Sequence, residues 1–183
     1  GLYYEEIAEF AAESVDVVVD EGDNINVAGR DMSILHTPGH SAGSLCVLDR
    51  ETNVAFTGDS FQGEGEGRPL LFNSLNEYLE SLKRAALKGF SNVVLGHPFP
   101  PFRKTILEGV EVGQFLKRSI NVALSLREKV LVELNEHGSL RVDELSKAMP
   151  QIPTVTAACV LEDLVREGVS SRKISDGKAL WIA

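Results

Sequence analysis

Short apolar runs separated by glycine- or proline-containing turns dominate the first 105 residues, and this pattern predicts strands. The predicted strands cover residues 15–19, 24–29, 31–36, 45–48, 54–57 and 92–95. The fourth and fifth of these runs flank a polar segment and are predicted to pair as a hairpin. Helical spacing of apolar residues predicts helices over 5–13 and 75–86, with Gly89 ending the second. The mixture indicates a fold of the α/β (α+β) class.

From Lys117 onward the pattern changes to consecutive helices and a final hairpin. The apolar spacing predicts three helices, over residues 118–137, 142–149 and 154–167. Asp176 and Gly177 then form a dipeptide typical of a two-residue hairpin turn. Three helices followed by a β-ribbon is the order of a winged-helix domain. We therefore predict a first domain over residues 1–110 and a small winged-helix domain over residues 118–183.

The composition is that of a folded protein. Hydrophobic residues make up 43% of the 183 residues and charged residues 25%, which excludes a largely disordered chain. Cys46 and Cys159 lie far apart in apolar stretches, which suits reduced thiols better than a disulfide framework. No apolar run reaches membrane-spanning length, and the first residues do not resemble a signal peptide. We expect a cytoplasmic location and no membrane partner.

Negative charge is concentrated in the first part of the chain. The formal net charge is −9, from 18 Lys and Arg against 27 Asp and Glu. Residues 1–117 hold 9 basic and 18 acidic residues, whereas residues 118–183 hold 9 of each. Binding to a nucleic-acid backbone needs cations that displace counterions, so this distribution disfavours a nucleic-acid function of the first part. A locally basic groove is still compatible with it.

Three predicted strands are each followed by a residue able to bind a metal ion. His40, Asp59 and His97 follow the strands that end near residues 36, 57 and 95. Strand ends hold side chains rigidly and gather them at one edge of a sheet. Imidazole and carboxylate ligands suit zinc or iron. The glycine-rich segment 62–68 predicts an irregular, mobile loop, which is more often a solvent-facing linker than a lid over a site.

The order of three motifs resembles that of a known family. H-T-P-G-H-S-A-G at residues 36–43, T-G-D at 57–59 and L-G-H-P at 95–98 resemble the C-terminal portion of the metallo-β-lactamase-fold hydrolases, over residues 1–105. The resemblance implies the C-terminal part of an αββα sandwich with one or two zinc ions. Residues 117–183 resemble the winged-helix appendage of the β-lactamase-like-protein-2 group, some members of which cleave single-stranded RNA.

By this resemblance, His40 is the third histidine of the first metal site, Asp59 the bridging carboxylate and His97 a ligand of the second metal. The family motif H-x-H-x-D-H, which supplies further ligands and an acid–base aspartate, does not occur in the sequence. The other two histidines, His36 and His137, are expected to have structural roles in the sheet and at a helix C-terminus. We therefore expect this chain alone to bind metal weakly and to be inactive. We also expect a missing N-terminal segment or a homo-oligomer to complete the sandwich.

The function favoured by these observations is that of a metal-dependent hydrolase, in which a metal-bound hydroxide attacks a thioester or a phosphodiester of single-stranded RNA. The rival hypothesis is a non-catalytic protein whose winged helix binds nucleic acid or a protein on a lactamase-like scaffold. Arg172, Lys173 and Lys178 of the predicted hairpin are its candidate phosphate contacts. The predicted third helix is acidic, which disfavours reading of a DNA groove. A flavin-linked di-iron oxidoreductase is a minor alternative, without a flavin domain in the sequence.

Overall fold

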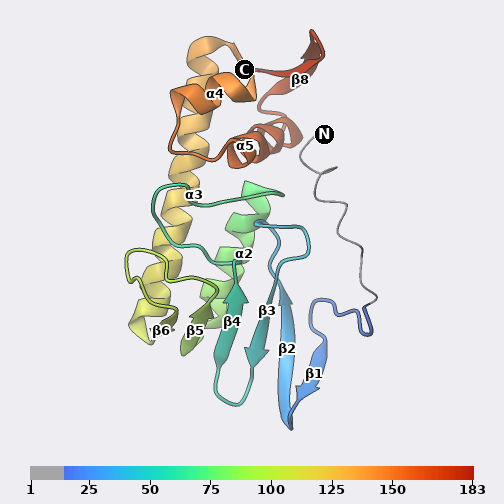
Figure 1. Cartoon of the computed structure of the whole chain (residues 1–183), viewed down its shortest axis with the longest axis vertical. Helices are drawn as coiled ribbons and strands as arrows, with labels where there is room; N and C mark the ends of the chain where they lie inside the picture. Colours follow the sequence, from blue (N-terminus) through green and yellow to red (C-terminus); the bar gives the residue numbers. More distant parts are fainter. Residues whose placement is uncertain (1–14) are drawn as a thin grey trace.

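The computed structural model describes residues 15–183, so the helix predicted over 5–13 lies outside the described residues. The larger of two sheets has six strands in the order β1-β2-β3-β4-β5-β6 (Figure 1). These strands are β1 (Asn24–Val27), β2 (Arg30–His36), β3 (Leu45–Asp49), β4 (Val54–Gly58), β5 (Asn92–Leu95) and β6 (Ile106–Glu108). Neighbouring strands are antiparallel except for β4 and β5, which are parallel.

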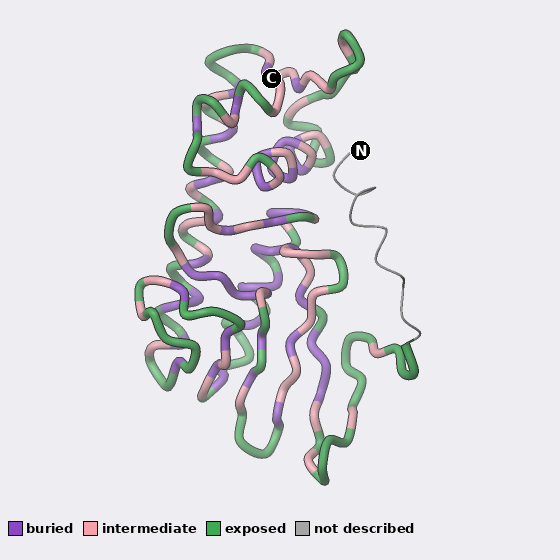
Figure 2. Tube along the Cα trace, in the orientation of Figure 1, coloured by how far each residue is buried: buried purple, intermediate pink, exposed green. Residues whose placement is uncertain are grey.

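Two helices that pack against each other cover one face of this sheet. α2 (Leu75–Lys88) is the crossover between the parallel strands β4 and β5, and α3 (Val110–His137) follows β6. α2 begins where the Ser74 hydroxyl accepts a hydrogen bond from the Glu77 amide, and it ends at Gly89. The alternate strand residues that contribute to the core are Leu35, Cys46, Ala55, Val93 and Leu107, along the buried segments in Figure 2.

The opposite face of the sheet is apolar as well. Its residues pair in register across five strands, in the row Ile34, Val47, Phe56, Val94 and Ile106. Phe56 is 44% exposed and Ile106 is 52% exposed. This outer face is therefore an apolar surface that is partly open to solvent.

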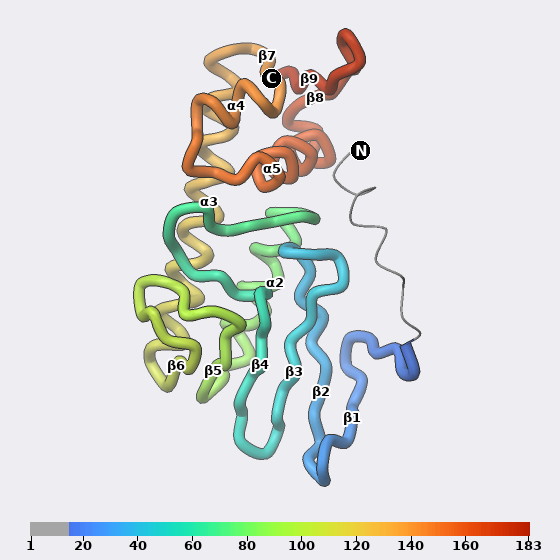
Figure 3. Tube along the Cα trace, viewed as in Figure 1, coloured from blue at the N-terminus to red at the C-terminus, as the bar shows by residue number. Residues whose placement is uncertain are grey.

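The C-terminal third consists of helices and a second, three-stranded sheet in the order β7-β9-β8 (Figure 3). Its elements after α3 are β7 (Ser139–Leu140), α4 (Val142–Ala148), α5 (Thr154–Arg166), β8 (Ser171–Ser175) and β9 (Lys178–Ile182). The helices lie near their predicted positions, and Asp176 and Gly177 form the predicted turn. The winged-helix assignment and the division into two domains stay predictions.

α5 is attached to the first part of the chain by buried polar contacts. The carboxylate of Asp163 accepts hydrogen bonds from the Ser74 hydroxyl and the Asn76 amide, each at 3.0 Å. Thr156 Oγ1 accepts from the Leu71 amide at 2.9 Å and donates to the Pro69 carbonyl at 3.0 Å. The hydrophobic core is likewise continuous from the six-stranded sheet to α5.

Two predicted elements differ from the structure, and one strand of the structure has no predicted counterpart. Residues 15–19 form no strand and expose Val15, Val17 and Val18, because β-branched side chains alone do not make a strand without a neighbour to pair with. α3 begins at Val110 and not at residue 118, because its first turns bury apolar side chains against the sheet. β6 was not predicted, since its three residues are too short to show a period.

No helix within the described part of the chain combines the length and the apolar character needed to cross a membrane.

Candidate metal centre

The three candidate ligands lie at one edge of the six-stranded sheet. β2 and β4 are both antiparallel to β3, and β4 is parallel to β5, so β2, β4 and β5 run in the same direction. His40, Asp59 and His97 follow the carboxyl ends of these three strands. The topology therefore brings together residues that are far apart in the sequence, as the strand-end pattern predicts.

Asp59 lies between the two imidazoles. Its Oδ1 atom is 3.4 Å from Nε2 of His97, and its Oδ2 atom is 3.9 Å from Nε2 of His40. The side chain of His40 is 20% exposed and that of His97 is 60% exposed. The site is thus accessible from solvent on the His97 side.

The orientation of His40 is fixed by its other ring nitrogen. Nδ1 lies 2.7 Å from the backbone carbonyl of Leu70, which is an acceptor, and 3.1 Å from Nε2 of Gln62, which is a donor. The shorter contact, to the carbonyl, favours a protonated Nδ1. This tautomer leaves the lone pair of Nε2 directed at Asp59. Metal-binding histidines commonly use such a bond to a backbone carbonyl to fix the ring and its tautomer.

Gln62 is a fully buried residue that supports this arrangement and that the sequence analysis missed. Its Nε2 atom donates to the carbonyls of Leu70 at 2.8 Å and Asp59 at 3.2 Å. Its Oε1 atom accepts from the Leu70 amide at 2.8 Å and from Arg68 at 3.3 Å. Gln62 therefore holds the loop carbonyl that orients His40. A buried glutamine inside a glycine-rich polar segment gives no signal in the sequence.

One carboxylate oxygen of Asp59 is buried without a hydrogen bond in the described part of the chain, as expected of an atom that binds a cation. Its Oδ1 atom is buried and has no hydrogen-bond partner within the described residues. A Cβ atom at Gly96 would lie 2.9 Å from this oxygen, so glycine allows the end of β5 to approach the carboxylate. An unpaired buried carboxylate oxygen is costly unless a cation or donor satisfies it.

The donor set fits zinc in chemistry but is incomplete in number. Two imidazole Nε2 atoms and a carboxylate are ordinary zinc ligands. Within residues 15–183, however, no three His, Cys, Asp or Glu side chains form a group arranged to hold a metal ion. The structure brings His40, Asp59 and His97 to one place, and their role as ligands stays a prediction.

The loop that carries His40 is packed tightly against α2. The Phe72 amide donates to the His40 carbonyl at 2.8 Å, and the Ser74 amide donates to the Gly39 carbonyl at 3.3 Å. The ring of Phe72 meets that of His40 edge to face, with centroids 5.4 Å apart. Tyr78 of α2 is buried, and its hydroxyl accepts a hydrogen bond from the Gln62 amide at 3.2 Å. Burial raises the pKa of this hydroxyl, so it stays protonated.

The remaining histidines and the cysteines have other surroundings. His36 is exposed and its Nε2 lies 2.8 Å from the Ala42 carbonyl, while His137 Nδ1 lies 3.0 Å from the Glu133 carbonyl near the end of α3. Both thiols are free and buried. Burial raises the pKa of Cys46 and that of Cys159 to about 11, so neither is a nucleophile at neutral pH.

The segment 62–68 has no regular structure, as predicted, but both of its halves are attached to the rest of the chain. The Glu64 amide donates to the Pro100 carbonyl at 3.4 Å, and the Gly67 amide donates to the Gln151 carbonyl at 3.1 Å. The segment thus contacts both the loop that follows His97 and the loop that precedes α5.

Replacing Gln62 with leucine is expected to disturb His40 without unfolding the protein. The Leu70 carbonyl would lose the amide that holds it, so the Nδ1–H tautomer of His40 would no longer be uniquely favoured. ¹⁵N NMR of the imidazoles should show this tautomer in the unchanged chain and a mixture in the variant. Zinc affinity should fall by about 10–100-fold, the usual cost of losing an outer partner of a metal ligand. Gln114→Leu, at an exposed position of α3, is the control, and equal spectra for both variants would contradict the assignment.

Known proteins match this chain over the region that contains the three motifs. The sequence model of the metallo-beta-lactamase superfamily matches residues 2–97, which is more than half of the chain. The chain therefore belongs to the metallo-β-lactamase superfamily, as its motifs indicate. A beta-lactamase domain protein from Burkholderia ambifaria has the same fold, with a TM-score of 0.71 and 20% identity over 100% of this chain and 56% of that chain.

Two curated relatives are thioesterases by name. Acyl-coenzyme A thioesterase MBLAC2 of Gallus gallus is 34% identical over 67 residues, which cover 37% of this chain and 24% of that protein. Atrochrysone carboxyl ACP thioesterase of Emericella nidulans is 26% identical over 172 residues, which cover 89% of this chain and 53% of that protein. The chain thus spans about half or less of the length of these relatives.

Proposed function

We propose that this chain is part of a zinc-dependent hydrolase that cleaves acyl thioesters. The observation that carries the proposal is that His40, Asp59 and His97 lie together at one sheet edge, where a buried oxygen of Asp59 accepts no hydrogen bond from the described residues. Both thioesterase relatives act on thioesters according to their names, and they support this substrate class over others. The family membership supports a hydrolase in general.

In this proposal His40, Asp59 and His97 hold the metal, and Gln62 and Leu70 orient His40. A bound zinc ion would supply Lewis acidity toward the thioester carbonyl and would lower the pKa of a coordinated water. Gly96 leaves room for the carboxylate of Asp59 beside the strand end. The exposed side of His97 is the route by which substrate enters.

A single additional polypeptide segment would complete both the metal site and the second layer of the sandwich. Family members carry the motif H-x-H-x-D-H, which these 183 residues lack, and the chain covers only 56% of the Burkholderia protein of the same fold. The outer sheet face exposes Phe56 and Ile106, as a surface made for a second layer would. We propose that a segment bearing H-x-H-x-D-H packs on this face. A second copy of the chain is the alternative occupant, and light scattering distinguishes the two.

The proposed function is tested with two proteins: this chain alone, and a protein that joins it to the H-x-H-x-D-H segment. We expect the joined protein, loaded with zinc, to release thiol from a simple acyl thioester. The chain alone should bind zinc with weaker than micromolar affinity in calorimetry and should not turn over. His40 would belong to one metal site and His97 to the other, so with the bridging Asp59 each ion would have only two protein ligands. Sub-micromolar affinity of the chain alone would contradict the ligand count. Absence of thiol release by the zinc-loaded joined protein would contradict the function.

A phosphodiesterase or a nucleic-acid-binding module is the second candidate, and the order of elements after α3 favours it. Its candidate cations are already partly neutralised, because Arg172 forms an ion pair with Glu162 of α5 at 2.5 Å. Together with the net charge of −9, this pair weakens the case for a polyanionic partner. A salt-sensitive mobility shift of labelled single-stranded RNA would support a nucleic-acid partner.

A further inference from the structure

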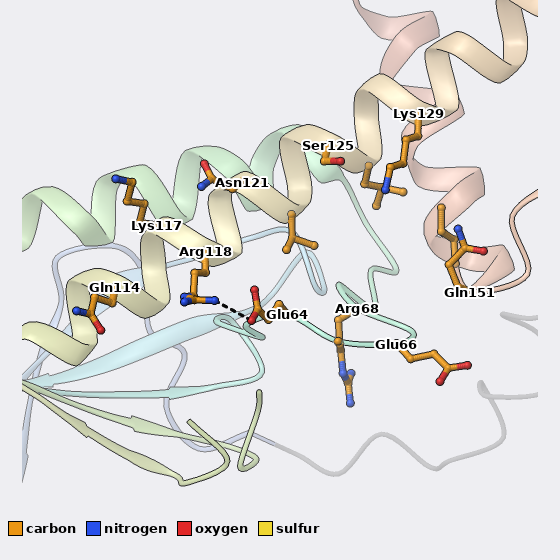
Figure 4. Close-up of a pocket in the computed structure, with 14 residues that line it drawn as sticks. Glu64, Glu66, Arg68, Gln114, Lys117, Arg118, Asn121, Ser125, Lys129 and Gln151 are labelled. Carbon is orange, nitrogen blue, oxygen red and sulfur yellow. Dashed lines mark hydrogen bonds and ion pairs between the residues drawn. The ribbon is translucent and has the colours of Figure 1, made fainter. Parts of the chain in front are cut away.

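A cavity of about 800 Å³ lies beside the candidate metal centre, between α3, the segment 64–68 and residues 151–152 (Figure 4). One stripe of α3 forms its long wall, at the spacing of three and four residues that places side chains on one helix face. This stripe consists of Gln114, Lys117, Arg118, Asn121, Ser125 and Lys129. A volume of this size suits a small-molecule ligand.

The cavity is locally positive in a negatively charged protein. Four cationic and two acidic side chains line it, although the whole chain has a net charge of −9. Arg118 is paired with Glu64 at 3.0 Å. Within residues 15–183, by contrast, neither Lys117 nor Lys129 has an ion-pair or hydrogen-bond partner, so both ammonium groups are available to a ligand. Positive charge gathered in a concave site raises the local concentration of anions.

Arg68 connects the cavity to the candidate metal centre. It lines the cavity, and its guanidinium donates to Oε1 of Gln62, the residue that orients the His40 loop. The same guanidinium lies over the ring of Phe99, 5.0 Å from the centroid. The ring of Phe99 in turn meets that of His97 edge to face, with centroids 5.6 Å apart. A ligand in the cavity therefore lies next to the residues that position the metal ligands.

We infer that this cavity binds the phosphate-bearing arm of the thiol carrier of a thioester substrate, an inference that rests on the proposed function. The arm has its phosphate at one end and its thiol at the other, and Lys117 and Lys129 stand twelve positions apart on α3, about 18 Å along a helix. One of them would contact the phosphate, and the other adds to the positive charge that attracts the anion. The neutral side chains of Asn121 and Ser125 between them provide hydrogen bonds for an amide-containing chain. Apolar lining from Leu126 and Ile152 accommodates its methylene groups. A phosphopantetheine-type arm, free in coenzyme A or attached to a carrier protein, has this chemistry.

The test measures binding of thiols to the metal-free chain, so it needs no turnover. Coenzyme A, 4′-phosphopantetheine and pantetheine, which has no phosphate, are titrated by calorimetry at low salt. We expect coenzyme A and phosphopantetheine to bind at least about tenfold more tightly than pantetheine, since each phosphate gains a charge-assisted contact. Equal affinity of the first two would indicate that the arm alone is recognised, and tighter binding of coenzyme A would indicate a nucleotide contribution.

Charge-reversal variants locate the site. Lys117→Glu and Lys129→Glu should each weaken coenzyme A binding by about tenfold or more and leave pantetheine binding unchanged. Both residues are exposed on a helix surface, so folding is preserved. Lys88→Glu, at an exposed position in the last turn of α2 and outside the cavity, is the matched control with no expected effect. An equal effect of all three variants, or equal binding of coenzyme A and pantetheine, would overturn the inference.

Hydrolysis of a thioester without phosphate separates this inference from the proposed function. If the zinc-loaded joined protein cleaves an N-acetylcysteamine thioester but Lys117→Glu does not affect coenzyme A binding, the cavity inference fails and the hydrolase stands. If Lys117→Glu abolishes coenzyme A binding but no thioester is cleaved, the cavity stands and the hydrolase fails. Tighter binding of single-stranded RNA than of coenzyme A, lost in the same variants, would overturn the thiol carrier as the ligand.

Discussion

Replacing Asp59 with asparagine is expected to abolish zinc-dependent thioester cleavage while leaving the metal-free fold intact. The variant keeps the shape of the side chain and removes its charge. In the protein that also carries the H-x-H-x-D-H segment, we expect both zinc affinity and kcat to fall by at least about 100-fold. This is the upper end of the loss seen when a mere outer partner of a metal ligand is removed, and Asp59 is the proposed ligand itself.

The stability of the metal-free protein should hardly change in Asp59→Asn. Oδ1 of Asp59 is a buried oxygen without a hydrogen-bond partner in the described part of the chain. The side chain is nevertheless 33% exposed, and Oδ1 lies 3.4 Å from Nε2 of His97, so removing its charge should change the free energy of unfolding by less than about 1 kcal/mol. Zinc should then raise the unfolding midpoint of the unchanged protein but not of Asp59→Asn, because only a state that binds the ligand is stabilised by it.

Glu136→Gln makes the same change of charge at an exposed position near the end of α3 and serves as the control. It should alter neither zinc affinity nor the stabilisation by zinc. If Asp59→Asn were destabilised in the absence of zinc and still bound zinc normally, Asp59 would be a structural turn residue. That outcome would remove the central ligand from the proposed site.

The convergence of the candidate ligands was predictable because it depends on strand order and direction. His40, Asp59 and His97 follow recognisable apolar runs, and turn-forming glycines occur beside each of them. A sheet in which the three strands run the same way places all three residues at one edge. The strand periods and the motifs were therefore sufficient for this part of the site.

The supporting residues were not predictable because they depend on tertiary contacts. Gln62 meets His40 through the Leu70 carbonyl and directly, with its Nε2 atom 3.1 Å from Nδ1 of His40, and neither Gln62 nor Leu70 belongs to a regular element. The cavity likewise requires the face of α3 to meet the segment 64–68, a meeting that no local pattern encodes. The start of α3 was misplaced for a related reason, since its first turns are stabilised by packing on the sheet.

Replacing Gly39, one residue before His40, with alanine is expected to cause the second large effect, a loss of stability. The Gly39 φ angle of 140° is in a region that residues with a Cβ atom rarely adopt. A Cβ atom there would lie 2.4 Å from Cα and 2.6 Å from N of Tyr78, both of which belong to the backbone of α2 and cannot move aside without shifting the helix. Backbone strain and overpacking together should make Gly39→Ala less stable by about 3 kcal/mol or more in urea denaturation.

Gly43→Ala supplies a control in the same loop, because a Cβ atom at Gly43 would have no neighbour within 4 Å and its φ angle is not in the positive region. That variant should change the free energy of unfolding by less than about 1 kcal/mol.

In Gly39→Ala the displaced loop should also lose the contacts of Phe72 and Ser74 with the His40 segment, which would move the imidazole away from Asp59. A folded Gly39→Ala variant should therefore show altered imidazole ¹⁵N shifts for His40, and failure of Gly39→Ala alone to fold agrees with the same steric cause. Equal stability of the two variants would show that the loop shifts to accommodate the added Cβ atom beside α2. Gly39 would then not determine where His40 lies.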